Sequence, residues 1–175
     1  DNKKTLQILS TIQYQFFLAI IDATSPDFAL PVKHAGVGLA RKIGMDLSIP
    51  FLKNKTSLLL SIDADTILSP NYLQTILHYF NNYDINAAVV GFKHTNSKRK
   101  NLEQAIRKYE EFLISTAKNI YKTGSPYGYV SMGSTIACTG MAYMAVGGMP
   151  KKKATEDFYF LQELAKFCGV FTIPE

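Results

Sequence analysis

Cysteine is scarce in this sequence, where Cys138 and Cys168 are the only two among 175 residues. Two cysteines cannot form a framework of several disulfide bonds, and with three scattered histidines they do not suggest a four-ligand zinc site. A metal site in this chain would therefore have to be built mainly from oxygen ligands.

Long apolar runs are also missing. No stretch reaches the roughly 18 apolar residues from which a membrane-spanning helix is recognised, so we expect no such helix within this chain. Glycine and proline number 11 and 7, which excludes collagen-like and low-complexity sequences.

The residues that are present suit a folded domain. Hydrophobic residues make up 47% and aromatic residues 12% of the chain, enough to form a core and too many for a disordered protein. The formal net charge of +5 would attract nucleic acid, anionic lipid or phosphorylated small molecules. The charge excess is modest and does not choose among these partners.

Short apolar runs alternate with segments of helical periodicity. Strands are predicted at 16–21, 57–62, 87–92 and 170–174. Helices are predicted at 3–13, 34–47, 69–80, 102–121 and 156–167, with Ser69 as an N-cap. This alternation predicts an α/β fold with a largely parallel sheet.

Two carboxylates follow the predicted strand 57–62, as Asp63 and Asp65 with one residue between them. Ligands bind beyond the carboxyl ends of strands in open parallel sheets. Two aspartates at alternate positions can point the same way, and their mutual repulsion favours a divalent cation such as Mg²⁺ or Mn²⁺. An ordinary strand end with two solvated aspartates is the alternative.

A second acidic pair, Glu156 and Asp157, opens the predicted helix 156–167 after Thr155. The ordinary explanation is that Thr155 caps the helix and the two acids complement its dipole.

Two weaker signals lie upstream. Asp22 follows the predicted strand 16–21, although an aspartate that forms a turn is the alternative there. Gly36 and Gly38 precede Arg41 in the predicted helix 34–47. Glycines at this position can approach a phosphate and an arginine can pair with it, but the pattern is not GxGxxG.

Taken in order, these features resemble the family 2 glycosyltransferases of GT-A fold. The resemblance is carried by Asp22, LARK at 39–42, DAD at 63–65, MGS at 132–134, GG at 147–148 and TED at 155–157. The closing stretch from Met132 is similar to the cellulose synthase-like branch, which also carries a TED motif. A DxD motif is unspecific alone, whereas DxD with GG and TED at these separations is fairly specific.

The resemblance implies a GT-A (nucleotide-diphospho-sugar transferase) fold with a mostly parallel central sheet flanked by helices. It covers most of the chain from Phe16 onward. Relative to the family, the first strand is lacking or abbreviated. We expect a single catalytic domain over 1–175, with a nucleotide-binding part at about 1–66 and an acceptor-side part at about 67–175.

The resemblance also implies roles for eight residues. Asp22, Arg41 and Asp63 would contact the nucleotide. Asp65, with Asp63, would bind the metal. Asp157 would be the general base, supported by Glu156, and Gly133 and Ser134 would lie near the donor sugar or the acceptor.

The implied activity is an inverting, metal-dependent hexosyl transfer from a nucleotide diphosphate sugar to an acceptor hydroxyl, with Mg²⁺ or Mn²⁺ as cofactor. A UDP-sugar is the expected donor, with GDP- or dTDP-sugars as alternatives. The expected acceptor is a saccharide or a lipid-linked molecule, in the synthesis of a cell-surface polysaccharide or glycolipid. The resemblance implies a cytoplasmic location, with peripheral association at the inner face of the cell membrane as one option, and no nucleic-acid partner.

Two other functions remain open. A nucleotidyltransferase also uses paired acids and a metal on an α/β sheet, but would need a glycine-rich basic loop after its first strand. A non-enzymatic basic module for nucleic acid or membrane surfaces would need clustered Lys and Arg beside exposed aromatics, whereas here the basic residues are dispersed.

Overall fold

The computed structural model describes residues 2–33 and 35–174. The chain divides into two compact units, residues 1–35 and residues 36–175. The single catalytic domain expected over the whole chain, with its internal boundary near residue 66, stays a prediction.

The first unit contains helix α1 (Asn2–Thr11), which confirms the helix predicted there. The prediction of a strand at 16–21 is wrong, because these residues form no regular secondary structure. A strand needs a neighbour to complete its backbone hydrogen bonds, and the described residues of this unit provide none. Phe16 and Phe17 are accordingly 67% and 82% exposed.

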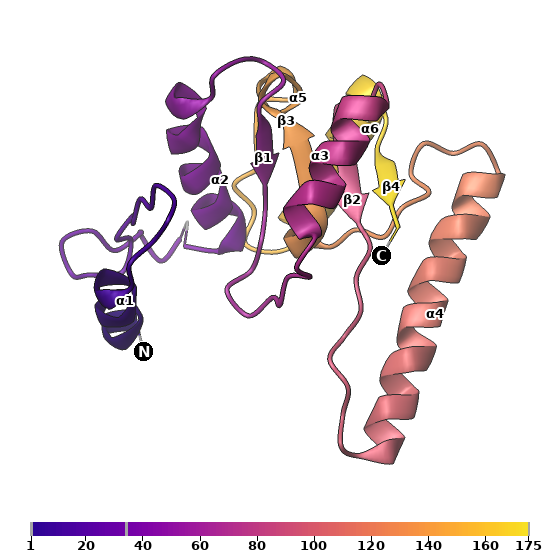
Figure 1. Cartoon of the computed structure of the whole chain (residues 1–175), viewed down its shortest axis with the longest axis horizontal. Coiled ribbons are helices and arrows are strands. Elements are labelled where there is room, and N and C mark those ends of the chain that lie inside the picture. Colours follow the sequence, from indigo (N-terminus) through magenta and orange to yellow (C-terminus); the bar gives the residue numbers. More distant parts are fainter. Residues whose placement is uncertain (1, 34, 175) are drawn as a thin grey trace. The chain divides into compact units, whose positions relative to one another are not determined.

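The second unit is built on a four-stranded sheet in the order β1-β3-β2-β4 (Figure 1). The strands are β1 (Leu58–Leu60), β2 (Ala87–Val90), β3 (Ile136–Thr139) and β4 (Phe171–Ile173). Strand β3 pairs antiparallel with both β1 and β2, whereas β2 and β4 are parallel. The α/β class is confirmed, but the sheet is mixed and not largely parallel, because β3 runs against its two neighbours.

Of the five α-helices described in this unit, four lie near their predicted positions, whereas the short helix over 140–145 was not predicted. The five helices are α2 (Val37–Ser48), α3 (Tyr72–Asn82), α4 (Lys100–Lys122), α5 (Gly140–Ala145) and α6 (Glu156–Cys168). Two 3-10 turns, η1 (Ile49–Phe51) and η2 (Gly133–Thr135), complete the set. Ser69 is not the N-cap of α3; Asn71 holds that position, and the Ser69 carbonyl accepts a hydrogen bond from Tyr72 N–H.

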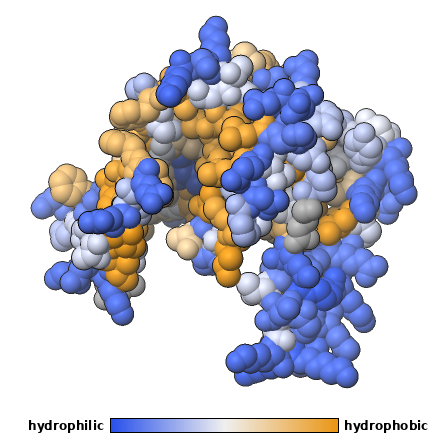
Figure 2. Space-filling view, in the orientation of Figure 1, coloured by the Kyte–Doolittle hydropathy of each residue, from blue (hydrophilic) through white to orange (hydrophobic). Residues whose placement is uncertain are grey.

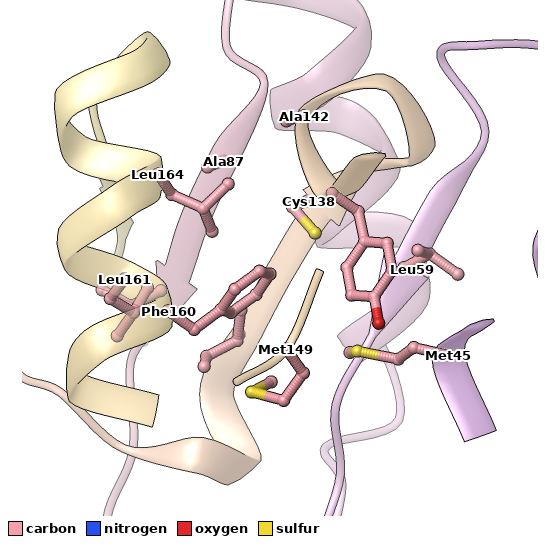
Figure 3. Packing of buried hydrophobic residues seen from close by; sticks show 12 residues of the cluster. Met45, Leu59, Ala87, Cys138, Ala142, Met149, Phe160, Leu161 and Leu164 are labelled. Atoms are coloured by element: carbon pink, nitrogen blue, oxygen red, sulfur yellow. The ribbon is translucent and has the colours of Figure 1, made fainter. Parts of the chain in front are cut away.

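Alternating side chains of the sheet form two cores. On one face, Leu59, Ala87 and Cys138 pack against α2, α5 and α6; Figure 3 shows Phe160, Leu161 and Leu164 of α6 directed at these strands. On the other face, Ala88 and Ala137 pack with Ile76 of α3. Strand residues one position apart thus belong to opposite cores, as the two-residue period of a strand requires.

Helix α4 flanks the sheet on the side of β4 and extends beyond it (Figure 1). A cavity of about 710 Å³ lies between this helix and strands β2 and β4, lined by residues that include Ala117, Val89 and Ile173. The end of α4 farthest from the sheet is covered by hydrophilic side chains in Figure 2. Among residues 2–33 and 35–174, no helix combines the length and apolar character needed to cross a membrane.

Candidate functional site

The strand directions bring several predicted site residues to one end of the sheet. Strands β1, β2 and β4 run in one direction and β3 runs in the other. Segments that follow β1, β2 and β4 therefore meet the segment that precedes β3. Asp63 and Asp65 come after β1, whereas Gly133 and Ser134 come before β3. The antiparallel β3, unexpected from sequence, is what places the MGS segment beside the DAD segment.

Arg41 joins three distant parts of the sequence. From helix α2, its Nη2 donates to Asp63 Oδ1 at 2.5 Å, and its Nη1 donates to Glu156 Oε1. The Arg41 and Glu156 side chains are 13% and 5% exposed, whereas Asp63 is 45% exposed. Buried charges are stable only when they are paired. The guanidinium thus connects the DxD motif to the TED motif and supplies the partner that Glu156 needs.

Two glycines allow this arrangement because they leave room for other groups. A Cβ on Gly133 would overlap the guanidinium of Arg41, with its Cζ 2.5 Å away. A Cβ on Gly38 would lie 2.6 Å from the Pro150 carbonyl oxygen and 2.9 Å from Glu156 Cβ. Both distances are far below van der Waals contact, so helix α2 can approach the loop before α6 only with glycine at position 38.

The backbone before helix α6 is strained. Thr155 has φ 61°, the one positive φ at a non-glycine residue within the described chain. Its side chain makes no capping hydrogen bond, and its Oγ1 bonds to the Ala154 carbonyl at 2.6 Å. Thr155 thus holds the N-cap position and both acids lie in the first turn, as the ordinary explanation of the TED motif requires, but the capping hydrogen bond of that explanation is not made. Such conformations cost about 1–3 kcal/mol and occur often at functional sites.

Asp157 occupies the first turn of α6 beside Glu156. Its Oδ1 accepts the backbone N–H of Phe158 at 2.8 Å. The side chain is half-buried, in contrast to the buried Glu156. Adjacent residues of a helix point in different directions, so Glu156 is committed to Arg41 while Asp157 retains a carboxylate oxygen for other partners.

Asp65 and Ser134 line a common cavity of about 500 Å³. Its wall also includes Lys93 and His94, which follow β2, and Tyr72, which begins α3. Tyr72 is 9% exposed, and its buried hydroxyl has no hydrogen-bond partner among the described residues. Burial raises the pKa of this phenol. A buried hydroxyl without a partner beside a cavity is a feature that a ligand or water would satisfy.

Asp22 belongs to the first unit, and the structure does not place it relative to the other site residues. Its Oδ2 accepts from Ser25 Oγ at 2.5 Å, and its Oδ1 accepts from the backbone N–H groups of Thr24 and Ser25. The Ser25 hydroxyl, followed by these backbone bonds, lowers the pKa of Asp22 to about 2. In this arrangement Asp22 stabilises its own turn; a nucleotide contact stays a prediction.

The acidic residues fit a cation that is shared with a substrate. No three Asp, Glu, His or Cys side chains gather into a metal-binding group in residues 2–33 and 35–174. Asp63 gives one oxygen to Arg41, whereas Asp65 is exposed at the cavity. Mg²⁺ commonly takes one or two carboxylates, several waters and substrate phosphate oxygens. Asp65 and the second oxygen of Asp63 are the candidates for that limited protein share.

Sequence reasoning missed a buried network on α4. Glu110 Oε1 accepts from the backbone N–H of His94 at 2.6 Å and pairs with its Nδ1 at 2.9 Å. Arg107 donates to Glu110 Oε2 at 2.5 Å and to the His94 carbonyl at 2.7 Å. The sequence did contain one signal for this network, because His94 follows a predicted strand just as Asp63 does.

Comparison with known proteins finds no match to this chain among family models, curated proteins or solved structures. What the site does must therefore be argued from its own residues.

Proposed function

We propose that this chain is a metal-dependent inverting glycosyltransferase that uses a nucleotide diphosphate sugar. The observation that carries the proposal is the pairing of Arg41 with both Asp63 and Glu156. It joins two acidic motifs that lie over ninety positions apart in the sequence and whose chemistry is complementary. One suits a diphosphate with its cation, and the other suits an acceptor hydroxyl.

The chain's own residues would divide the reaction between them. A sugar hydroxyl is a weak nucleophile and needs a base within hydrogen-bond reach. Asp157 would take that proton, through the oxygen that Phe158 N–H does not occupy. Glu156, held by Arg41, would fix the start of α6 and so position Asp157. Attack by the hydroxyl on the anomeric carbon, with departure of the nucleoside diphosphate, is a single displacement with inversion.

The donor side would use Asp63, Asp65 and Arg41. Asp65, with Asp63, would hold Mg²⁺ or Mn²⁺, which when bound supplies positive charge to the leaving diphosphate. Arg41 lies beside both carboxylate motifs, which suits a nearby phosphate as a further partner. Gly133 and Ser134 would lie at the sugar, since Ser134 shares a cavity with Asp65.

The wider setting follows from the proposed chemistry and not from any targeting feature. A UDP-sugar is the preferred donor, with GDP- and dTDP-sugars as alternatives. The acceptor would be a saccharide or lipid-linked molecule of a cell-surface polysaccharide or glycolipid. Nucleotide sugars are cytoplasmic metabolites in this setting, so the enzyme would work there or at the inner face of the membrane. The GT-A form of the α/β fold is part of the same proposal.

The test is thermal unfolding with UDP, GDP and dTDP, each with and without Mn²⁺. A ligand that binds only the folded state stabilises it by about 2.7 kcal/mol at a hundredfold excess over its Kd. We expect a rise in Tm that needs both one nucleotide and Mn²⁺, and that disappears in Asp65→Ala. The matched control is Asp84→Ala, an exposed aspartate in a loop between α3 and β2.

Other outcomes separate the rivals. Stabilisation by nucleoside triphosphates alone, with release of pyrophosphate on turnover, would favour a nucleotidyltransferase. Affinity for nucleic acid or anionic vesicles that collapses with salt and ignores Mn²⁺ would favour a basic binding module. No stabilisation by any nucleoside diphosphate with the metal would contradict the transferase.

A further inference from the structure

We propose that His94 binds a sugar hydroxyl in the cavity it shares with Asp65 and Ser134, and that Glu110 is the positioning residue that orients its ring. This inference rests on the proposed function for the class of ligand. It adds two residues that no motif in the sequence identifies.

The first step is to establish which nitrogen of the His94 ring carries the hydrogen that faces Glu110. Burial raises the pKa of Glu110, but hydrogen bonds from the His94 backbone and ring and from Arg107 outweigh burial, so its pKa lies below the ordinary value. Glu110 is then a carboxylate, which can only accept hydrogen bonds. Nδ1 of His94 must therefore carry the hydrogen that it shares with Glu110 Oε1.

The second step concerns the other ring nitrogen. With Nδ1 committed to Glu110, Nε2 is the atom left for a ligand, and it makes no hydrogen bond to any described residue. A carboxylate that accepts a hydrogen bond from one ring nitrogen fixes both the tautomer and the orientation of an imidazole. The His94 side chain is 36% exposed and belongs to the cavity wall. The ring is thus held at Nδ1 in a side chain that is partly exposed.

The third step is how firmly this segment is held. Arg107 bonds to the His94 carbonyl and to Glu110, while Glu103 accepts from Arg107 Nε at 2.8 Å and from Ser97 N–H at 2.7 Å. These bonds tie the loop after β2 to helix α4. These several side-chain hydrogen bonds to one loop suit a residue whose position is important for binding.

The fourth step is the chemistry of the cavity. A saccharide offers hydroxyl groups that both donate and accept, together with apolar C–H faces. The wall combines hydroxyl and amide side chains with apolar ones, among them Thr66, Asn71, Ser134, Phe92 and Met132. Its volume of about 500 Å³ lies in the range of small-molecule sites. Tyr72 belongs to the same wall, and its buried hydroxyl has no hydrogen-bond partner among the described residues.

The experiment is imidazole ¹⁵N NMR of the full chain labelled at histidine. His94→Gln identifies the His94 signals. The probes are UDP-glucose, UDP-N-acetylglucosamine and GDP-mannose, then UDP and GDP alone, all with Mg²⁺, and finally free glucose, N-acetylglucosamine and mannose. We expect protonated Nδ1 without ligand and a shift of Nε2 on addition of a sugar-bearing probe, larger than with the nucleotide alone. Nucleotide sugars and free sugars distinguish a donor sugar from an acceptor sugar.

Matched variants test the two roles. His94→Gln should weaken binding of the sugar-bearing probe about tenfold, the effect of one hydrogen bond, and leave UDP binding unchanged. His78→Gln, at an exposed histidine of α3, should leave both unchanged. Glu110→Gln should alter the tautomer populations of His94, whereas Glu103→Gln, on the same helix and also bonded to Arg107, should not. A merely structural Glu110 would not produce that difference.

The two proposals fail in different ways. If a nucleoside diphosphate binds with metal but no sugar-bearing probe moves Nε2, the sugar site is refuted and the transferase stands. If free sugars move Nε2 while no nucleotide binds, the transferase is refuted and the sugar site stands. An Nε2 signal that no saccharide or nucleotide sugar moves overturns the inference in every case.

Discussion

At the scale of single residues, the site depends on which carboxylates are already committed. Glu156 is buried against Arg41, and Asp63 gives one oxygen to the same guanidinium. Asp157 and Asp65 are the members of the two motifs without such a partner among the described contacts. Each motif therefore combines one acid that is paired with Arg41 and one acid for which no ion pair is described.

The first prediction concerns Asp157. Asp157→Asn removes the proposed base while keeping the size of the side chain, so sugar transfer should fall by at least about a hundredfold with donor binding almost unchanged. The measurement compares initial rates of transfer and donor Kd among the wild type, Asp157→Asn and the control Asp84→Asn. Turnover close to wild type in Asp157→Asn would remove Asp157 from the reaction.

The second prediction concerns pH and Asp22. Because its pKa in the folded unit is about 2, below the ordinary value of 3.8, the ionised turn stabilises the first unit fully above about pH 4. That contribution is lost as the pH falls through about 2. A ¹³C carboxyl titration should show the low midpoint, and Ser25→Ala, which removes the largest cause of the shift, should raise it. An unchanged midpoint in Ser25→Ala would contradict the assignment to this turn.

At the scale of elements, helix α2 is the part whose position matters most, because it delivers Arg41. Its contact with the loop before α6 depends on Gly38, one turn before Arg41. Gly44 lies on the same helix, but a Cβ there would meet no atom within 4 Å. The two glycines make a matched pair in one helix.

The third prediction uses that pair. Gly38→Ala should destabilise the fold by about 1–3 kcal/mol, since backbone carbonyls cannot yield to the new Cβ, and should abolish stabilisation by nucleotide and Mn²⁺. Gly44→Ala should stabilise it by about 0.5–1 kcal/mol, because alanine is the better helix residue. Denaturant unfolding of both variants gives the comparison. Equal effects of the two substitutions would mean that α2 does not pack as described.

Elements were predictable from sequence where their own side chains determined them. Helices α2, α3, α4 and α6 and strands β1, β2 and β4 all appear where periodicity places them. The strand prediction at 16–21 was wrong because an apolar sequence cannot form a strand without a neighbouring strand as its hydrogen-bond partner. Strand β3 was not predicted, and its antiparallel pairing makes the expected largely parallel sheet wrong, because strand pairing is set by distant residues. Arg41 was identified from its position, but its bonds to Asp63 and Glu156 depend on contacts that no local pattern encodes.

At the scale of the whole molecule, both hydrophobic cores belong to residues 36–175. No described residue of the first unit, which contains Asp22, is among the residues of either core. Of the eight residues to which the resemblance assigns roles, Asp22 lies in the first unit and the other seven lie in the second.

The fourth prediction follows from this division. Residues 36–175 produced alone should fold cooperatively, with a circular dichroism spectrum of an α/β protein and a sigmoidal thermal transition. If the shortened chain is still stabilised by a nucleotide with Mn²⁺, Asp22 is not needed for donor binding; if only that stabilisation disappears, the first unit supplies part of the site. Failure of residues 36–175 to fold would refute the independence of their cores.

The position of β3 in the sheet also governs when the protein can fold as it is synthesised. Strands β1 and β2 are not neighbours; β3, which begins at Ile136, lies between them and pairs with both. Until that strand has left the ribosome, β1 and β2 have neither their hydrogen-bond partner nor a complete core. A nascent chain of this protein therefore carries two apolar, unpaired strands while residues 91–139 are added, the state in which chaperone capture and aggregation compete with folding.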